Sequence, residues 1–237
     1  MFPLRDDQPT FSTPFVTYFL IALNLVIFFF EWQLGLQNPR ALNQMVFQFG
    51  VVPHIDVELL TGTPVFAPTA AILPMFTSMF LHGSWLHVLG NMWMLWIFGD
   101  NIEDYLGHFK YLVFYLLCGL AAALTHIAFN LNSKAPTVGA SGAIAGVMGA
   151  YLILYPHARV LIWFPPIFLF QIPAWVMLGY WGVTQFLYGA ATSISPAAQQ
   201  GGIAFWAHVG GFLAGAIMAI AVYHYISDVH FPPKLRR

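Results

Sequence analysis

The sequence predicts an all-α, polytopic membrane protein with six transmembrane helices and a long, partly interfacial first loop. Of its 237 residues, 59% are hydrophobic and only 7% are charged, whereas soluble domains carry roughly 25% charged residues. Six apolar segments also approach the length of about 20 residues that a helix needs to cross a bilayer. No stretch has the composition of a separate soluble domain, so residues 1–237 are expected to form a single transmembrane domain with short terminal tails.

The six expected spans follow the apolar runs in chain order. They are Pro14–Glu31, Trp85–Phe98, Tyr111–Asn130, Val138–Tyr155, Pro173–Ala190 and Ile203–Ile226. The connection Trp32–Ser84 is apolar and interrupted by prolines, which argues against a free linker. We therefore expect this first loop to lie partly in the membrane interface.

A further apolar run, Val160–Ile172, raises the alternative of a seventh span. It is shorter than the six others, and it contains Pro165-Pro166, a pair that cannot sit inside a regular helix. A run of this length is typical of an interfacial or re-entrant elbow. The count matters because a seventh span would place His208 on the opposite membrane face from Ser141.

The distribution of cationic residues predicts the orientation. With the amino terminus inside, the outer segments hold only Arg40 and Lys134. The inner segments then hold Arg5, Lys110, Arg159, Lys234, Arg236 and Arg237. Because cytoplasmic loops carry an excess of Lys and Arg, both termini are expected in the cytoplasm. The expected location is a bacterial inner membrane, with the starts of spans two, four and six on its outer side.

Composition also limits the partners and cofactors. The net charge of -1 and the lack of a basic cluster argue against a nucleic-acid partner. A single cysteine, Cys118, provides no disulfide framework. No His-Glu-x-x-His motif occurs, so neither a metal site nor another cofactor is predicted. The lipid bilayer is the expected partner, the oligomeric state cannot be inferred, and histidines such as His54, His126 and His157 are expected to have interfacial or packing roles.

Three spans that run in the same direction carry polar side chains near their starts. Ser141 opens the fourth span and His208 lies a few residues into the sixth. Asn91 lies about one and a half turns into the second span, on the same helix face as His87. Taken singly, such residues often only bond their own helix or a neighbouring helix. Polar groups that can meet inside a membrane nevertheless indicate a functional site.

These side chains suit nucleophilic catalysis. A serine hydroxyl needs a neighbouring base, and imidazole is the usual one. No Asp or Glu lies at that level of the six spans, so Ser141 and His208 are predicted to form a dyad rather than a triad. An oxyanion also needs hydrogen-bond donors. The backbone N–H of Ser141 and the side chains of Asn91 and His87 are the available donors.

Glycine spacing supports close contact between the fourth and sixth spans. Gly142 and Gly146 are four residues apart in one, and Gly211 and Gly215 are four apart in the other. Small residues at this spacing let two helix backbones approach closely. The two helices are thus expected to bring Ser141 and the base together.

With these motifs the chain resembles the rhomboid family of intramembrane serine proteases. The shared motifs are Gly-x-Ser-Gly at 139–142, Ala-His-x-Gly-Gly at 207–211, and His82, His87 and Asn91 in a His-x4-His-x3-Asn pattern. The resemblance implies a six-helix core, Ser141 as nucleophile, His208 as base, and His87 and Asn91 as oxyanion donors together with the Ser141 amide. It also implies that His82 braces the first loop, with Gly139, Gly142 and Gly211 as structural support.

Two departures from the family pattern concern loop placement and the base. Some members have an aromatic residue one turn after the nucleophile that stacks on the base, whereas this chain has Ala145. Some also carry a Trp-Arg pair in the first loop, which is absent between Thr61 and Phe80. Something other than residue 145 is therefore expected to orient His208.

The leading hypothesis is a serine endopeptidase that hydrolyses peptide bonds in or near transmembrane segments of other proteins. The alternative is a non-catalytic bundle, such as a transporter with His82, His87 and His208 along a polar pathway. Transporters usually contain internal repeats with broken helices in matching positions, and no repeat is evident here. We also expect Thr192–Gly202 to be a mobile cap and the fifth span to move to admit substrate.

Overall fold

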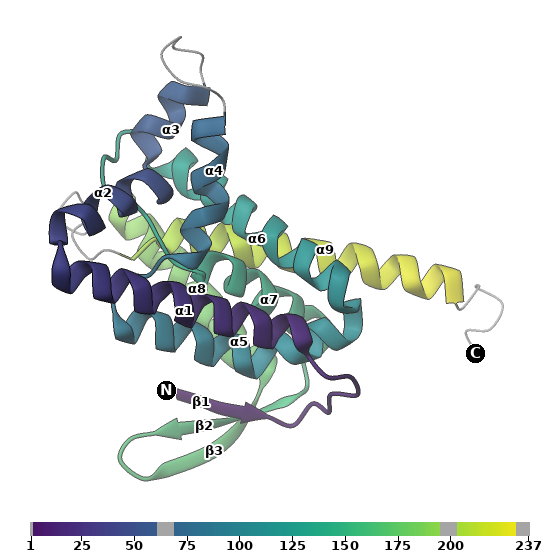
Figure 1. Ribbon diagram of the computed structural model, residues 1–237. Coiled ribbons are helices and arrows are strands. Elements are labelled where there is room, and N and C mark those ends of the chain that lie inside the picture. Colours follow the sequence, from purple (N-terminus) through teal and green to yellow (C-terminus); the bar gives the residue numbers. More distant parts are fainter. Residues whose placement is uncertain (1, 61–68, 195–202, 231–237) are drawn as a thin grey trace.

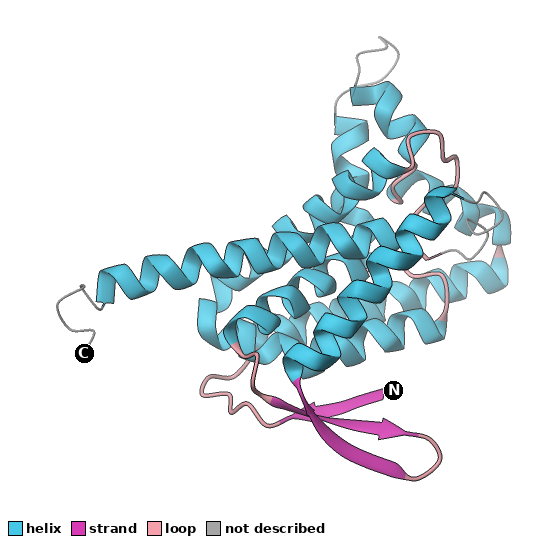
Figure 2. Cartoon of the chain, turned by 180° about the vertical axis from the view of Figure 1, so that it is seen from behind, coloured by secondary structure: helices cyan, strands magenta, loops and turns pink. Residues whose placement is uncertain are grey.

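In the computed structural model, which describes residues 2–60, 69–194 and 203–230, a bundle of helices lies beside a small sheet (Figures 1 and 2). Each expected span corresponds to one helix. These helices are α1 (Phe15–Gln37), α5 (Trp85–Leu106), α6 (His108–Phe129), α7 (Ser141–Leu154), α8 (Ala174–Ile194) and α9 (Phe205–His230). The positions of all six helices therefore agree with the hydropathy of the sequence.

Three of the described helices are long and apolar enough to cross a membrane alone, namely α1, α6 and the Phe205–Tyr223 part of α9. The pair Ile72–Phe80 and Trp85–Leu106, bent by 89°, gives a fourth if it is counted as one span. Helix α7 is apolar but has only 14 residues. The chain is a multi-pass membrane protein, and the expected number of six crossings stays a prediction.

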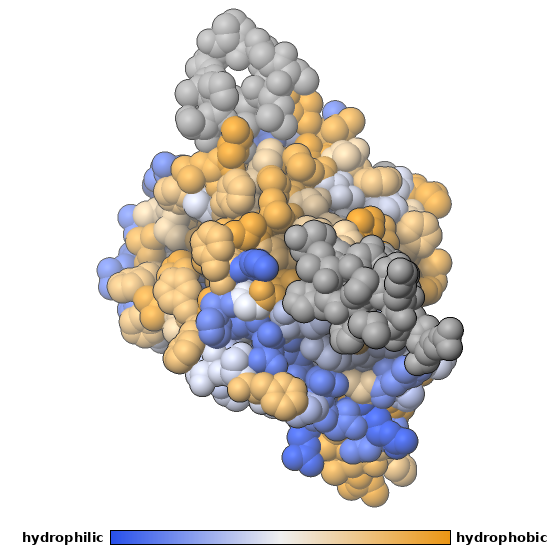
Figure 3. All heavy atoms as spheres, turned by 90° about the vertical axis from the view of Figure 1, so that its right-hand side faces the viewer, coloured by the Kyte–Doolittle hydropathy of each residue, from blue (hydrophilic) through white to orange (hydrophobic). Residues whose placement is uncertain are grey.

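The surface of the bundle agrees with membrane insertion. Figure 3 views the end of the bundle near the start of α1, where hydrophilic residues gather over part of the face and apolar residues surround them. The carboxylate of Glu103 organises this end, because it accepts hydrogen bonds from the backbone N–H groups of Val16 at 2.8 Å and Thr17 at 2.7 Å. It thereby satisfies amides that the first turn of α1 leaves unpaired.

The first loop is largely helical where it is described. It contains α2 (Pro39–Phe49), α3 (Pro53–Leu60), α4 (Thr69–Thr77) and a 3-10 turn, η1 (Ser78–Phe80). The side chain of Asn38 caps α2 by accepting a hydrogen bond from the Ala41 N–H at 3.1 Å. Helices α3 and α4 pack against α6, so this loop is part of the folded domain rather than a free linker.

The all-α prediction is wrong in one respect, because the chain also forms a three-stranded antiparallel sheet. Strands β1 (Phe2–Asp6), β2 (Arg159–Phe164) and β3 (Phe168–Pro173) pair in the order β1-β2-β3. The expected elbow at Val160–Ile172 is thus a β-hairpin rather than a re-entrant segment. Its β-branched and aromatic residues favour strands, and the two prolines lie in the turn, where the ladder needs no N–H donor.

This sheet lies along α5, as Figure 1 shows. The indole N–H of Trp93 on α5 donates a hydrogen bond to the carbonyl oxygen of Pro3 at 2.6 Å. Strand β1 occupies an edge of the sheet, and its partner β2 comes from the connection between α7 and α8. Hydropathy alone does not reveal that these apolar residues are strands: β2 pairs locally with β3 and, on its other edge, with residues 2–6.

The tightest packing in the bundle joins α7 and α9. A Cβ atom on Gly211 would collide with the backbone oxygen of Gly142, and one on Gly215 would collide with that of Gly146. The predicted close approach of these two helices is therefore confirmed. It follows from the missing side chains, because any larger residue would push the two backbones apart.

Candidate active site

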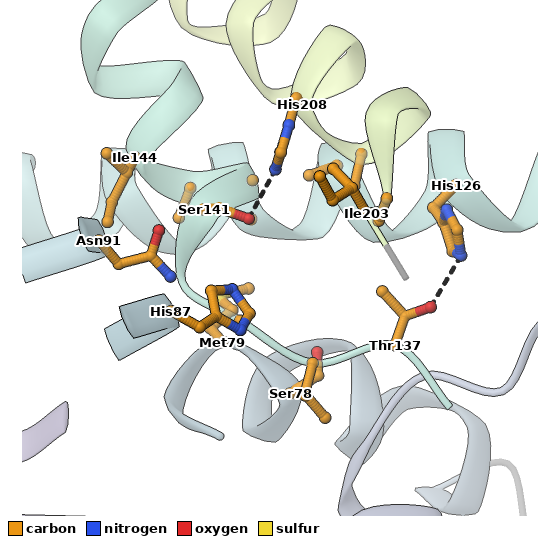
Figure 4. A pocket seen from close by; sticks show the side chains of 18 of the residues that line it. Ser78, Met79, His87, Asn91, His126, Thr137, Ser141, Ile144, Ile203 and His208 are labelled. Carbon is orange, nitrogen blue, oxygen red and sulfur yellow. Dashed lines mark hydrogen bonds between the residues drawn. The ribbon is translucent and has the colours of Figure 1, made fainter. Parts of the chain in front are cut away.

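Helices α7 and α9 bring Ser141 and His208 together. Ser141 is the first residue of α7, and His208 lies in the first turn of α9. The distance between Ser141 Oγ and His208 Nε2 is 2.7 Å (Figure 4). Both side chains are half-buried. This is hydrogen-bond geometry for a hydroxyl and the base that could deprotonate it.

The backbone before Ser141 is non-helical and is held by three backbone hydrogen bonds. Thr137 and Val51 exchange backbone hydrogen bonds of 2.7 and 3.0 Å, and the Gly139 N–H donates to the Ser78 carbonyl oxygen at 2.8 Å. Non-helical backbone at membrane depth is tolerated where it lines a cavity. These contacts fix the direction in which the chain enters α7, and hence the position of Ser141.

Gly139 cannot be replaced without strain. Its φ angle is +134°, and a Cβ there would lie 2.7 Å from Nε2 of His87. This φ value is one that only glycine adopts readily. The missing side chain lets the His87 ring pack against the backbone two residues before Ser141. The structure thus gives a physical reason for the predicted structural role of Gly139.

His87 and Asn91 face the cavity on the side of Ser141 away from His208 (Figure 4). Both lie on α5, where the Ser84 side chain caps the helix by accepting a hydrogen bond from the His87 N–H at 3.2 Å. The backbone N–H of Ser141 lies in the first turn of α7, where amides have no partner within the helix. Two side chains and one amide are therefore available on this side as donors.

His82 orients Asn91. The side-chain nitrogen Nδ2 of Asn91 lies 3.0 Å from Nε2 of His82, and both residues are buried. In turn, the His82 backbone N–H donates to the carboxylate of Glu31 on α1 at 3.1 Å. One amide proton of Asn91 is used in the contact with His82, which leaves the other for a group in the cavity. His82 connects the end of the first loop with α1 and α5, as expected for a bracing residue.

These groups line one cavity of about 560 Å³. Its polar lining includes Ser141, His208, His87 and Asn91, while small residues such as Gly142 form part of its wall. A cavity of this size is within the range of small ligand sites. It therefore has room for a small group beside the serine.

The sequence interpretation missed two of the residues around this site. Nδ1 of His208 lies 2.8 Å from Oε1 of Gln185 on α8, and the ring centroids of His208 and Trp181 are 5.8 Å apart. Ala145 is fully buried, so α8 instead supplies the groups that contact the imidazole. A single glutamine in an apolar span usually hydrogen-bonds to a neighbouring helix, and this requirement is the signal that could have drawn attention to Gln185.

His126 is the second residue missed. The sequence predicts an interfacial or packing role for it, whereas in the structure it lines the cavity from α6, and its Nε2 lies 2.9 Å from Oγ1 of Thr137 (Figure 4). The contact adds a side-chain bond to the segment that leads to Ser141. His126 therefore belongs to the wall of the site.

Comparison with known proteins agrees with these motifs. A Rhomboid domain model matches residues 70–225. The chain is 31% identical over 147 residues to Rhomboid protein 1, mitochondrial, of Saccharomyces cerevisiae, covering 59% of this chain and 39% of that protein. It is 32% identical over 135 residues to the human Presenilin-associated rhomboid-like protein, mitochondrial, covering 55% of this chain and 35% of that protein.

A plant relative is more distant. RHOMBOID-like protein 5 of Arabidopsis thaliana is 26% identical over 164 residues, which covers 67% of this chain and 48% of that protein. The chain thus spans less than half the length of each of these relatives. The domain match nevertheless covers most of the chain and includes the cavity residues from Ser78 to His208. The chain belongs to the rhomboid family.

Proposed function

We propose that this chain is an intramembrane serine endopeptidase that hydrolyses peptide bonds in or near transmembrane segments of other membrane proteins. The observation that carries the proposal is the 2.7 Å contact between Ser141 Oγ and His208 Nε2 inside a cavity of a membrane protein. Family membership supports the same reaction class. Ser141 acts as nucleophile and His208 as general base in this proposal.

The proposed reaction is acyl transfer in two steps. His208 Nε2 accepts the hydroxyl proton as Ser141 Oγ attacks the substrate carbonyl carbon, and the same imidazole then donates this proton to the leaving amine. Water, activated by His208, cleaves the resulting ester and releases the second product. The described residues place no carboxylate in hydrogen-bond contact with His208, which is consistent with the proposed dyad.

The negative oxygen of the tetrahedral intermediate lies, in this proposal, on the side of Ser141 that faces α5. Donors there are the Ser141 backbone N–H and the side chains of Asn91 and His87. Asn91 is preorganised by His82, and donors held in position before the reaction stabilise developing charge most effectively.

The proposed orientation in the membrane depends only on the distribution of Lys and Arg residues. Both termini lie on the cytoplasmic side and the cavity opens toward the outer side, as the distribution of Lys and Arg predicts. Of the cations used, Lys234, Arg236 and Arg237 lie outside the described residues. The two relatives with mitochondrial names give no support for a bacterial inner membrane. The proposal therefore specifies the orientation of the chain in its membrane but not which membrane it is.

Substrate access is proposed to involve α8. This helix packs mainly against α9 and α7, and its displacement would open the cavity laterally to lipid. The first three residues of the expected cap Thr192–Gly202 form the helical end of α8 instead of a loop, and residues 195–202 lie outside the described residues. The cap therefore stays a prediction from composition.

Cleavage of a single-span model substrate in liposomes tests the proposed function. Ser141→Ala is expected to lose cleavage altogether, because the nucleophile is removed. Ser133→Ala, at a serine in the connection between α6 and α7, is the matched control and is expected to cleave like the wild type. Equal cleavage by the Ser141 variant and the wild type would refute the peptidase mechanism.

A further inference from the structure

The imidazole of His208 is held at both of its nitrogens. Nε2 faces Ser141 Oγ at 2.7 Å, and Nδ1 faces the side-chain oxygen Oε1 of Gln185 at 2.8 Å. Gln185 is half-buried on α8. An arrangement of serine, histidine and an acceptor on the far nitrogen has the connectivity of a catalytic triad, with a neutral amide in the third position.

The acceptor determines which nitrogen carries the proton. A neutral imidazole has one N–H and one lone pair, and His208 can accept the serine proton only if the lone pair is on Nε2. An amide oxygen opposite Nδ1 favours the tautomer with the proton on Nδ1. Without that acceptor the proton can reside on Nε2 and point at Ser141. In this tautomer Nε2 has no lone pair available, so His208 cannot accept the serine proton.

Gln185 lies on a different helix from both residues of the dyad. Helix α8 is seated on α9 by ring contacts of Trp181 with His208 and Phe212, both at 5.8 Å between centroids. Farther along α8, a Cβ on Gly189 would lie 3.2 Å from the ring of Trp206. The distance from Gln185 to the imidazole therefore depends on how α8 sits against α9.

We propose that Gln185 is the positioning residue of the base, and that it makes the activity of His208 depend on α8 being seated against α9. The inference rests on the proposed function. When α8 moves away to admit a substrate, the Gln185 amide no longer accepts a hydrogen bond from Nδ1, and His208 can adopt the inactive tautomer with its proton on Nε2. When α8 returns, the amide restores the competent tautomer beside the bound substrate. Substrate entry and peptide-bond cleavage therefore take place at different positions of α8.

Two substitutions at position 185 test the acceptor. Gln185→Met keeps the length of the side chain but removes the acceptor. It is expected to lower kcat by about 10- to 100-fold with little change in KM, which is less than the roughly 10²- to 10⁴-fold contribution of general acid–base catalysis as a whole, because the base is misplaced rather than removed. Gln185→Glu keeps an acceptor and is expected to recover most of this loss. Because a carboxylate favours the protonated imidazole, the acid limb of its pH–rate profile should also move to higher pH.

The titratable groups that act on His208 from other helices are His87 on α5 and His126 on α6, and both stay in place in these variants. Thr184→Val is the matched control, because Thr184 donates only to the carbonyl oxygen of Trp181 in its own helix at 2.7 Å. It is expected to behave like the wild type. If Gln185→Glu is as slow as Gln185→Met, or its acid limb does not move, the positioning role is wrong.

The Ser141→Ala and His208→Ala variants separate this inference from the proposed function. If either one cleaves as fast as the wild type, the proposed function itself fails. If both are inactive while Gln185→Met keeps the rate of Thr184→Val, only the role of Gln185 is refuted.

A disulfide tests the dependence on α8. A Cβ on Gly189 would lie 3.5 Å from Cβ of Phe205, which suits a disulfide, so Gly189→Cys with Phe205→Cys can lock α8 to α9. The oxidised protein is expected to keep fluorophosphonate labelling of Ser141 and to lose cleavage of a membrane-embedded substrate, with recovery on reduction. Unchanged cleavage after full oxidation, or loss of labelling, would overturn the coupling.

Discussion

Asn91 and His82 show how one polar residue in a membrane protein depends on another. The amide of Asn91 is held by the ring of His82 at 3.0 Å, and His82 is held through its backbone by Glu31. Burying such groups is costly unless they are paired. The chain from Glu31 to Asn91 supplies these partners, and it leaves one amide proton pointing toward the place where charge would develop.

Asn91→Ala is expected to lower kcat by about 10²-fold or more with a smaller effect on KM, because an oxyanion donor acts mainly in the transition state. His87 could supply part of the missing stabilisation, so the double variant with His87→Ala should be slower still. Steady-state cleavage of the model substrate measures both constants. A fall in thermal stability with normal kcat of the folded fraction would mean that Asn91 is only structural.

Asp6 gives the domain a pH-dependent stability. Burial raises the pKa of the Asp6 carboxyl to about 6, although the hydroxyl of Tyr151, which donates to it, acts in the opposite direction. The carboxyl therefore binds its proton more tightly in the folded than in the unfolded state. The free energy of unfolding should decrease as pH rises from about 4 through 6, and level off above this range.

Thermal unfolding of the detergent-solubilised protein across this range checks the effect. Asp6→Asn mimics the protonated form and should reduce the slope of the unfolding temperature against pH, while Asp56, whose pKa burial also raises to about 6, keeps its own contribution. Asp7→Asn, at the exposed neighbouring position, is the control: it keeps the Asp6 carboxyl and removes only the minor contribution of the Asp7 charge to its raised pKa, so most of the slope should remain. A wild-type slope in Asp6→Asn would show that another group is responsible.

At the scale of elements, the contact between α7 and α9 places the nucleophile beside the base. Because the two glycine pairs have no side chains of their own, the helix backbones are in direct contact at Gly142 with Gly211 and at Gly146 with Gly215. The spacing of these glycines was readable from the sequence. The residues on α7 and α9 that face each other therefore follow from the pattern with no knowledge of the loops.

Gly215→Val is expected to destabilise the fold by about 2 kcal/mol or more, because overpacking in a close contact typically costs 1–3 kcal/mol and the obstacle here is the backbone of Gly146. Gly179→Ala on α8 is the control, since a Cβ there meets no atom within 4 Å. It should be neutral or slightly stabilising. Equal unfolding temperatures for the two variants would contradict the packing described for α7 and α9.

At the scale of the whole molecule, hydropathy predicted where the helices lie, because apolar length is the main requirement for a membrane helix. It could not predict the sheet. Short apolar runs do not distinguish a strand from a buried helix, and β2 pairs not only with its neighbour β3 but also with residues 2–6, which are more than 150 residues away in the sequence. The number of crossings depends on the membrane as well as on the chain, and it stays open to measurement.

The candidate site was predictable only where its residues belong to local sequence motifs. Ser141, His208, His87 and Asn91 belong to short motifs that the sequence displays directly, and the structure places all four around one cavity. Gln185 belongs to no such motif. Its contact with His208 arises from the way α8 packs on α9, and no residue spacing in the sequence predicts that Gln185 contacts the base in place of an aromatic residue at position 145.

The central claim is that His208 activates Ser141 for nucleophilic attack. Reaction with a fluorophosphonate, followed by mass spectrometry of the digested protein, tests it most directly because the probe reacts with an activated serine without needing a natural substrate. The predicted result is a single adduct on Ser141 in the wild type, with none in Ser141→Ala and almost none in folded His208→Ala. An adduct on another residue, or labelling of His208→Ala at the wild-type rate, would contradict the claim.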